Sequence, residues 1–415
     1  MSTIIPASIL GLPGQCVNQI HEKKDGSILI EYRRDRRKKP VDPVTGKQGT
    51  VNRYVRRLIQ DLPFLHRPCF LEIEQAQVHI EKNQRRMESL SFVDPYQRYT
   101  KRFCQLVSGL CRHMSVQAVS LHLGIRWETT KNMDKAYLRE SLPALHPEEL
   151  TNLKWIGVDE VARAKGHDYM TVVYDLEKGN LIWVHEGRTS ETLSIFLTAL
   201  PEETALGIEA VAMDMGPAYR KAVKEHLPQA AIIFDRFHVM QNYSKVIRNQ
   251  RRIEFRRASR KEDQELIKGS LYLLLKNPEK LKPGQMEKLE SLRNSNDNLN
   301  LIYMLKEQLQ QLWALPESFD TMKERLESWC QMADESGLHY LKRFAKSLRR
   351  HATGICNYAK YPLTTARIEA GNVAIGMIRK RARGIRDTEY FKLKIRQISI
   401  PDQPSMFYQN AVQAH

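Results

Sequence analysis

The sequence lacks paired cysteines and long apolar segments. Its 415 residues include six cysteines, and no two of them form a Cys-x-x-Cys pair. Widely spaced cysteines favour reduced, mostly buried thiols over a disulfide framework. The start, MSTIIPASILGLPG, has neither the basic residues nor the apolar segment of a signal peptide, and no apolar run approaches the roughly 20 residues that span a bilayer. We therefore expect a cytoplasmic protein without a membrane partner.

Acidic residues are also too few to balance the basic ones. The chain has 65 Lys and Arg against 48 Asp and Glu, which gives a net charge of +17. This charge suits a polyanionic partner, and nucleic acid is the usual one, although a basic enzyme or a ribosome-associated protein has a similar balance. Apolar residues make up 42% of the chain, enough for sizeable cores, and the length suits roughly two to four domains.

Residues 1–92 are predicted to form a β-rich N-terminal domain. Residues 27–33 read as a short strand, and residues 70–80 alternate apolar and polar side chains at period two, as strands do. Residues 33–50 read as a basic loop between short strands.

Residues 93–150 change to a helical pattern. Ser120, Gly124 and Ile125 supply a small residue, a turn glycine and an apolar residue at the spacing that two tightly crossed helices need. This spacing predicts a helix-turn-helix that binds DNA, although other helical hairpins share it.

Residues 151–240 are rich in strands, in the order strand-strand-strand-helix-strand-helix-strand. This order predicts an α/β fold with a mixed sheet covered by helices, as in a ribonuclease H-like core. Residues 241–350 are almost entirely helical and charged, and therefore read as a large helical insertion. Residues 351–400 return to the core with one last helix at 364–383, and residues 401–415 form a tail.

Three acidic residues occupy positions that suit chemistry. Asp159 and Asp214 each follow an apolar strand, so both carboxylates should emerge at the C-terminal edge of the sheet. Glu369 lies about 100° round the last helix from an apolar stripe that begins at Ile368, so it can point toward those strand ends. Singly, each residue could cap a helix or remain solvated. Together and in this order, they favour a site.

A carboxylate cluster of this kind needs a positive partner. Magnesium or manganese, which prefer hard oxygen ligands, can neutralise it. Two such ions about 3.5–4 Å apart can activate an attacking hydroxyl and stabilise the leaving oxygen of a phosphoryl displacement. The three carboxylates therefore predict a metal-dependent enzyme acting on phosphodiesters.

Several motifs resemble the ISL3 family of insertion-sequence transposases, over residues 50–400. They are IGVDE, AVAMDMGPAY, the block LPQAAIIFDRFHVM, and ARIEAGN running into IRKRARGIRDTEYFKLKI. The resemblance implies an Asp-Asp-Glu triad on a ribonuclease H-like fold. It also implies that Asp159, Asp214 and Glu369 are catalytic and hold the metal ions, with Asp235, His238 and Asn372 in support. His238 could instead cap a helix or pack in the core.

The chain departs from the family pattern in two places. The family's N-terminal domain usually holds zinc on paired cysteines, but here only Cys16 and Cys69 are available. We therefore expect a degenerate zinc-ribbon-like region without structural zinc. Before the third carboxylate the family tends to have Ser-Asn-Gly, where this chain has Thr364, Thr365 and Ala366.

DNA contacts are expected from two places. The start of the second helix of the helix-turn-helix should read bases, and the basic run after Glu369 should follow the phosphate backbone, unless it is only a solvated helix face. Trp313 fits core packing better than stacking on a DNA end. The residues expected to bind DNA are Arg126, Thr129, Thr130, Lys131, Asn132, Arg379, Lys380 and Arg383.

The combined reading is a transposase associated with the nucleoid. It would bind the terminal inverted repeats of its element, cleave double-stranded DNA and join the 3′ ends to target DNA. Two ends must be handled together, so a homo-oligomer is expected. A catalytically inactive DNA-binding descendant is the main alternative, and a different ribonuclease H-like nuclease, such as a junction resolvase, is a third.

Overall fold

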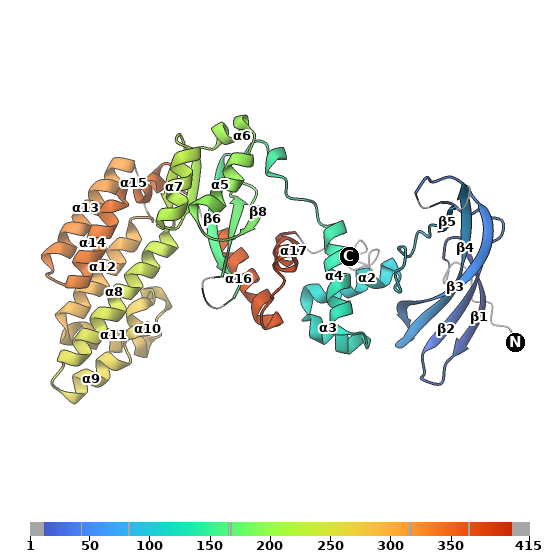
Figure 1. Cartoon of the computed structure of the whole chain (residues 1–415). Helices are drawn as coiled ribbons and strands as arrows, with labels where there is room; N and C mark the ends of the chain where they lie inside the picture. The colour runs from blue at the N-terminus through green and yellow to red at the C-terminus, as the bar shows by residue number, and fades with distance from the viewer. Residues whose placement is uncertain are drawn as a thin grey trace, which may run out of the picture. The chain divides into compact units, whose positions relative to one another are not determined.

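The computed structural model describes residues 12–42, 44–81, 84–164, 166, 168–314, 318–363 and 366–400 (Figure 1). By its contacts the chain divides into two compact units. The first unit comprises Met1–Pro143 and Lys380–Ile398, and the second comprises Ala144–Arg379 and Ser399–His415. Among the described residues no helix is long and apolar enough to cross a membrane.

A five-stranded mixed sheet forms the N-terminal part of the first unit. The strand order is β1-β2-β4-β3, with β5 paired to β4, and β2 runs parallel to β4 while the other pairs are antiparallel. Its strands are β1 (Gln15–Glu22), β2 (Ile28–Arg34), β3 (Thr50–Phe64), β4 (Arg67–Glu81) and β5 (Gln84–Met87).

The strands β3 and β4 are much longer than the short strands predicted for this region. Each has 15 residues, and the two pair antiparallel along nearly their whole length. Leu71, Ile73 and Gln75 are buried at alternate positions of β4, so one face of this strand is covered. β3 carries arginines among its apolar residues, and one of them, Arg57, pairs directly with the buried Ile73. These arginines interrupt the apolar alternation, which is why the sequence did not predict this strand.

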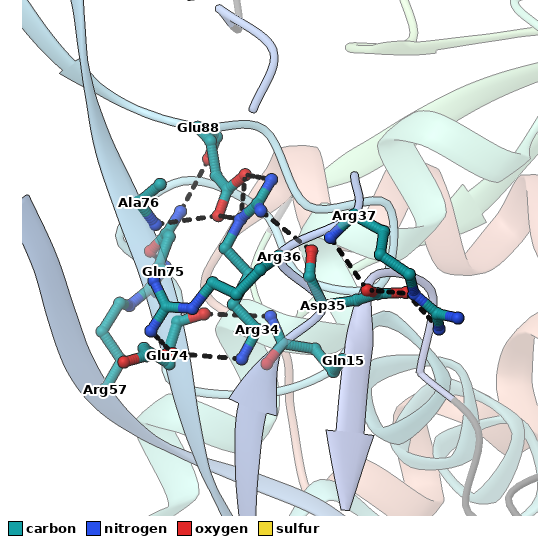
Figure 2. A network of polar contacts seen from close by, with 10 residues as sticks. All are labelled: Gln15, Arg34, Asp35, Arg36, Arg37, Arg57, Glu74, Gln75, Ala76 and Glu88. Carbon is teal, nitrogen blue, oxygen red and sulfur yellow. Dashed lines mark hydrogen bonds and ion pairs between the residues drawn. The ribbon is translucent and has the colours of Figure 1, made fainter. Parts of the chain in front are cut away.

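A buried ion pair fastens this sheet (Figure 2). The Arg34 guanidinium donates to both carboxylate oxygens of Glu88 at 2.9–3.0 Å, and both side chains are almost fully buried. Glu88 also accepts from the backbone N–H of Ala76 at 2.8 Å, and its carbonyl accepts from the Gln75 side chain. The pair therefore joins β2 to β4 and to the segment that follows β5.

The two cysteines of this region lie on strands that are not neighbours. Cys16 is exposed on β1 and Cys69 is buried on β4, with β2 between these strands. Across the described ranges, no three His, Cys, Asp or Glu side chains are grouped so that they could hold a metal ion. Our expectation that no structural zinc binds here stays a prediction.

The helical part of the first unit confirms the helix-turn-helix. α2 (Lys101–His113) precedes α3 (Val116–Leu123) and α4 (Trp127–Ser141). Gly124 ends α3 in the left-handed region at φ 66°, which glycine adopts without strain, and the Ser120 hydroxyl donates to the Ile125 carbonyl at 2.8 Å. Ser120 and Gly124 thus form the turn between α3 and α4 that their spacing predicted.

A further helix, α17 (Thr388–Ser399), belongs to the first unit and was not predicted. The last helix predicted from the sequence ends at residue 383, and residues 384–400 were expected to belong to the core without a helix of their own. Tyr390, Phe391 and Leu393 of α17 are buried.

The second unit contains a mixed sheet in the predicted element order. The strand order in space is β10-β9-β6-β7-β8, with β6, β7 and β8 antiparallel and β9 and β10 parallel to β6. The strands are β6 (Trp155–Ala162), β7 (Tyr169–Asp175), β8 (Asn180–Glu186), β9 (Ala210–Met213) and β10 (Ala231–Phe234). Between them lie α5 (Ser190–Ala199), the unpredicted short helix α6 (Glu202–Gly207) and α7 (Pro217–His226).

In the part of the chain that the structure describes after β10, helices follow without another strand, as predicted. Figure 1 shows α8 to α15 stacked beside the sheet. α8 begins immediately after β10, so one long helix passes from the sheet into the helical region with no break at residue 240. Trp313 is 3% exposed and packs in the main core, as favoured. The helices are α8 (Arg236–Arg257), α9 (Lys261–Lys268), α10 (Leu271–Leu275), α11 (Pro283–Ser295), α12 (Asp297–Gln311), α13 (Phe319–Glu335), α14 (His339–Arg350) and α15 (Ala352–Cys356).

The helix α16 (Ala366–Ala382) packs on β6 and β7 at two glycines. A Cβ atom on Gly157 of β6 would lie 2.3 Å from Ile368 Cδ1. A Cβ atom on Gly371 of the helix would lie 2.5 Å from the Tyr174 hydroxyl. The sheet and α16 each have a glycine at a point of contact, so the backbones of the two can approach closely. Ile368 and Ile375 are buried, as the predicted stripe requires.

Candidate functional site

Asp159 and Asp214 lie on neighbouring parallel strands of the second unit. Gly157 of β6 pairs with Ala212 of β9, so each aspartate stands two residues beyond that pair. β9 ends at Met213, and Asp214 follows it as predicted. Asp159 does not end its strand, because β6 continues paired with β7 as far as Ala162. The prediction that it terminates β6 was therefore wrong, although its place beside Asp214 is kept.

His238 stands among three carboxylates. Its ring nitrogens lie 3.8 Å from Asp214 Oδ1, 4.0 Å from Asp159 Oδ1 and 3.9 Å from Asp235 Oδ2. Asp235 caps the N-terminus of α8 by accepting from the Phe237 N–H, and His238 follows on the first turn. The cap fixes where α8 starts, and this places the imidazole between the two strand aspartates.

Glu369 and Asn372 approach the same group from α16. The Asn372 side-chain amide donates to Asp159 Oδ2 at 2.6 Å. Glu369 lies three residues earlier, on an adjacent part of the helix surface. Its carboxyl is near enough to Asp235, His238 and Asp159 to interact with them electrostatically. The structure thus brings Glu369 to the side of the sheet where Asp159 lies.

Burial and mutual repulsion perturb these carboxyls. Burial raises the pKa of Asp159, against the hydrogen bond from the Glu160 N–H, the charge of His238 and the Asn372 amide. Burial also raises the pKa of Glu369, and the negative charges of Asp235 and Asp159 add to this effect. Raised pKa values that arise from burial and from neighbouring charges are typical of functional sites.

Glu160 is a fourth acidic residue that the sequence reading overlooked. It follows Asp159 directly, and its pKa is raised first by burial and further by the charges of Asp159 and Asp214. Arg188 lies 3.8 Å from its carboxylate, and the guanidinium rests 4.1 Å from the Tyr169 ring centroid. The IGVDE motif contained the signal, but consecutive strand residues normally face opposite sides of a sheet.

This donor set fits a hard divalent cation. All the acidic ligands are carboxylate oxygens, and Asn372 Oδ1 is buried without a hydrogen-bond partner among the described residues. An unpaired buried oxygen is costly unless a cation, water or donor meets it. Among the described residues, however, no three His, Cys, Asp or Glu side chains are grouped so that they could hold a metal ion. The carboxylates therefore lie near one another without forming a complete set of metal ligands.

The predicted base-reading residues differ in accessibility. Arg126 and Asn132 are exposed and Thr129 is half-buried. Thr130 is fully buried and its hydroxyl donates to the Arg126 carbonyl, so its side chain cannot reach a base in this conformation. Lys131 lies 2.8 Å from the Asp387 carboxylate in an ion pair within the first unit. Thr130 is therefore structural in this state, contrary to its predicted role, whereas DNA binding by Lys131 stays a prediction.

The predicted phosphate-binding path along α16 is also altered. Arg379 is half-buried and donates to the Ala162 carbonyl at 2.7 Å. α16 ends at Ala382, so Arg383 has left the helix, with φ 53°. Arg379 and Arg383 therefore do not share one helical face. Lys380 and Arg383 remain exposed.

Comparisons with known proteins agree on one family. A protein-family model described as a transposase matches residues 156–395, and one described as the helix-turn-helix domain of transposase family ISL3 matches residues 88–138. The chain is 34% identical to the transposase for insertion sequence element IS1001 of Bordetella parapertussis, over 82% of this chain and 84% of that protein. It is 25% identical to the transposase for insertion sequence element IS1557 of Mycobacterium tuberculosis, over 77% and 76% of the two chains.

Proposed function

Because the chain belongs to transposase family ISL3, we propose that it moves an insertion sequence by cutting the element's ends and joining their 3′ hydroxyls to target DNA. Its helix-turn-helix would bind the terminal inverted repeats. Two ends must be handled together, so the working form would be a homo-oligomer, acting on double-stranded DNA of the nucleoid. The net charge of +17 suits this partner.

We assign catalysis to Asp159, Asp214 and Glu369. The observation that carries this assignment is the position of His238, within 4.0 Å of both strand aspartates, together with the electrostatic contact between Glu369 and Asp159. The sheet order, with three antiparallel strands and two that run parallel to the first, supports a ribonuclease H-like core. Residues 151–240 and 351–379 would form that core and residues 241–350 the insertion, whereas residues 380–398, expected in the core from the sequence, belong to the first unit.

Magnesium or manganese would be held by the three carboxylates. Bound there, the metal would activate the attacking hydroxyl and stabilise the leaving oxygen. Two contacts within the chain would orient the residues around this metal site. Asn372 holds the Asp159 carboxylate in one orientation, and the Asp235 cap fixes the helix that carries His238. The His238 imidazole lies within 4.0 Å of both strand aspartates and would stand beside the site.

Base recognition is assigned to the start of α4. In helix-turn-helix proteins the N-terminal residues of the second helix contact base edges in the major groove. Arg126 and Asn132 are exposed at that end of α4, and Thr129 is half-buried beside them. We propose that these three residues read the terminal repeat.

Cleavage of a labelled duplex that carries the element's end, with and without magnesium, tests the proposal. We expect wild-type cleavage only with the metal, and none from Asp214→Asn, which should still bind the duplex. Asp320→Asn, on α13, removes the same charge elsewhere and should cleave normally. Wild-type binding without cleavage in magnesium or manganese would instead identify an inactive DNA-binding descendant.

A further inference from the structure

The first unit contains a groove that the helix-turn-helix alone does not form. It has a volume of about 680 Å³ and lies between the starts of α3 and α4 and the segment that joins α16 to α17. We call it the basic groove. Its walls include Val116, Leu121, Trp127, Lys131, Arg383 and Arg386.

The segment on one wall of the groove is anchored at both ends. At its start, Arg381 donates to the Arg112 carbonyl of α2 at 2.8 Å. At its end, Asp387 accepts from the Tyr390 N–H and from Lys131 and Lys135 of α4. Burial would raise the pKa of Asp387, but these hydrogen bonds outweigh it and hold the pKa well below its usual range.

The helix α17 is bonded to α4 along its length. Its Tyr390 hydroxyl and Lys394 ammonium both contact the fully buried carboxylate of Asp134, at 2.6 Å and 3.1 Å. Glu389 pairs with Lys135 and Arg139. α17 is therefore a fourth helix of the DNA-binding unit, and the position of the segment before it is determined by α4 itself.

The anchoring leaves positive charge on the groove rim. Among the described residues that line the groove, Asp387 is the one acidic residue, and it pairs with two lysines. Arg381, Arg383 and Arg386 are exposed. Arg383 adopts φ 53°, a region that non-glycine residues rarely occupy and that persists only where the surrounding structure enforces it.

We propose that the segment from Arg381 to Arg386 binds the phosphate backbone of the same duplex whose major groove receives α4. When the second helix of a helix-turn-helix enters the major groove, the first helix crosses the backbone. The groove lies at the starts of both helices, where phosphates pass. Guanidinium groups suit phosphate because their donors match its oxygens in pairs. The inference rests on the proposed function, since it assumes that α4 binds DNA.

Two consequences follow from this assignment. End binding depends on residues that come after Glu369 in the chain, so residues 93–150 alone would bind weakly. The segment also contributes affinity but no sequence preference, because phosphates are the same in every sequence.

The test compares full-length variants in binding two duplexes, one with the element's end and one of unrelated sequence, at several salt concentrations. Arg383→Gln combined with Arg386→Gln should weaken binding of both duplexes by the same factor, about tenfold or more, and reduce the salt slope by about two. Arg126→Ala, at the proposed reading helix, should mainly reduce the preference for the element's end. Lys342→Gln combined with Arg343→Gln, both exposed on α14 of the second unit, is the control that removes the same number of charges.

An unchanged salt slope in the double variant would overturn the inference. The inference would also fail if the double variant lost only the preference for the element's end, or if it reduced self-association in sedimentation with DNA affinity intact. Failure of the wild-type chain to bind either duplex would refute the proposed function itself. Equal unfolding temperatures of wild type and variant show that any loss is local.

Discussion

The side-chain amide of Asn372 donates to the Asp159 carboxylate at 2.6 Å, and so joins the helix that carries Glu369 to the strand that carries the first aspartate. The other amide atom, Asn372 Oδ1, is buried without a hydrogen-bond partner among the described residues. One side chain thus holds a catalytic candidate in place and presents an unused oxygen beside it. A residue used only for packing would gain nothing from a buried oxygen that has no hydrogen-bond partner.

Asn372→Ala should shift the pH dependence of cleavage. The amide hydrogen bond lowers the pKa of Asp159, so its removal raises that pKa further above the usual value. Protonation then begins at higher pH, and the acidic limb of the pH profile should move up, with the rate at its plateau falling roughly 10-fold or more. The measurement is the rate of end cleavage against pH at fixed magnesium.

Asn357 offers the control for this experiment. Its amide donates to the Ile232 carbonyl of β10 at 2.8 Å, and not to a carboxylate. Asn357→Ala should cost stability to a similar degree and leave the pH profile in place. If both variants moved the acidic limb equally, Asn372 would be only a packing residue.

Asp159→Asn should stabilise the metal-free chain while abolishing cleavage. The folded-state pKa of Asp159 is raised, so the folded state binds the proton more tightly than the unfolded state does. Stability contributed by the protonated form is therefore lost as pH rises from the usual pKa of Asp through the raised one. Above that window, removing the charge should add on the order of 1 kcal/mol to the free energy of unfolding. Denaturant unfolding at pH 4 and pH 7 measures the difference, which should be larger at pH 7.

Magnesium should reverse the order of stability of these two proteins. A cation that binds the folded chain adds stability, and its ligands must be deprotonated. Wild type should therefore gain unfolding temperature with magnesium at pH 7 and much less at pH 4, whereas Asp159→Asn should gain little at either pH. An equal gain in both proteins would place the cation somewhere other than this carboxylate.

Much of the second unit could be predicted from its sequence, because its buried strands are short apolar runs followed directly by acidic residues. Asp214 behaves in this way. At Asp159 the same pattern predicted the end of β6 wrongly, because the strand continues through Glu160 and Val161, which pair with β7. A local pattern shows where an apolar run stops, but not where a neighbouring strand continues to pair.

The features missed in the first unit depend on partners far away in the chain. α17 is stabilised because Tyr390 and Lys394 both contact the buried carboxylate of Asp134. These residues lie far apart in the sequence, so a local sequence pattern does not reveal the contact. Arg383 was predicted to share a helix face with Arg379 because it lies four residues further along the predicted helix, but α16 ends at Ala382. Tertiary contacts such as the bond from Arg381 to the Arg112 carbonyl accompany the actual end of the helix.

The ion pair of Arg34 and Glu88 should be a main support of the N-terminal sheet. Glu88→Ala leaves the Arg34 charge buried and unpaired, and should lower the free energy of unfolding by about 3–5 kcal/mol. The pair of Arg37 and Asp35, also drawn in Figure 2, is the contrast, because the Arg37 side chain is 86% exposed. Arg37→Ala should change the free energy of unfolding far less, because water screens this exposed pair. Equal losses in urea unfolding would show that the buried pair has no special weight.

The contact between Gly371 and Tyr174 should control where Glu369 lies. A Cβ atom at Gly371 would meet the Tyr174 hydroxyl at 2.5 Å, so Gly371→Ala must push α16 away from β7 and move Glu369 with it. We expect a cleavage rate reduced roughly 100-fold, the effect of about 1 Å of misplacement.

Gly376→Ala, on the same helix with nothing within 4 Å of the added atom, should instead stabilise the chain by about 0.5–1 kcal/mol and keep its activity. Tyr174→Phe removes the hydroxyl that the new methyl group meets, so it should restore much of the rate to Gly371→Ala. Without such a rescue in the double variant, the glycine would matter for some reason other than the close approach of the helix to the sheet.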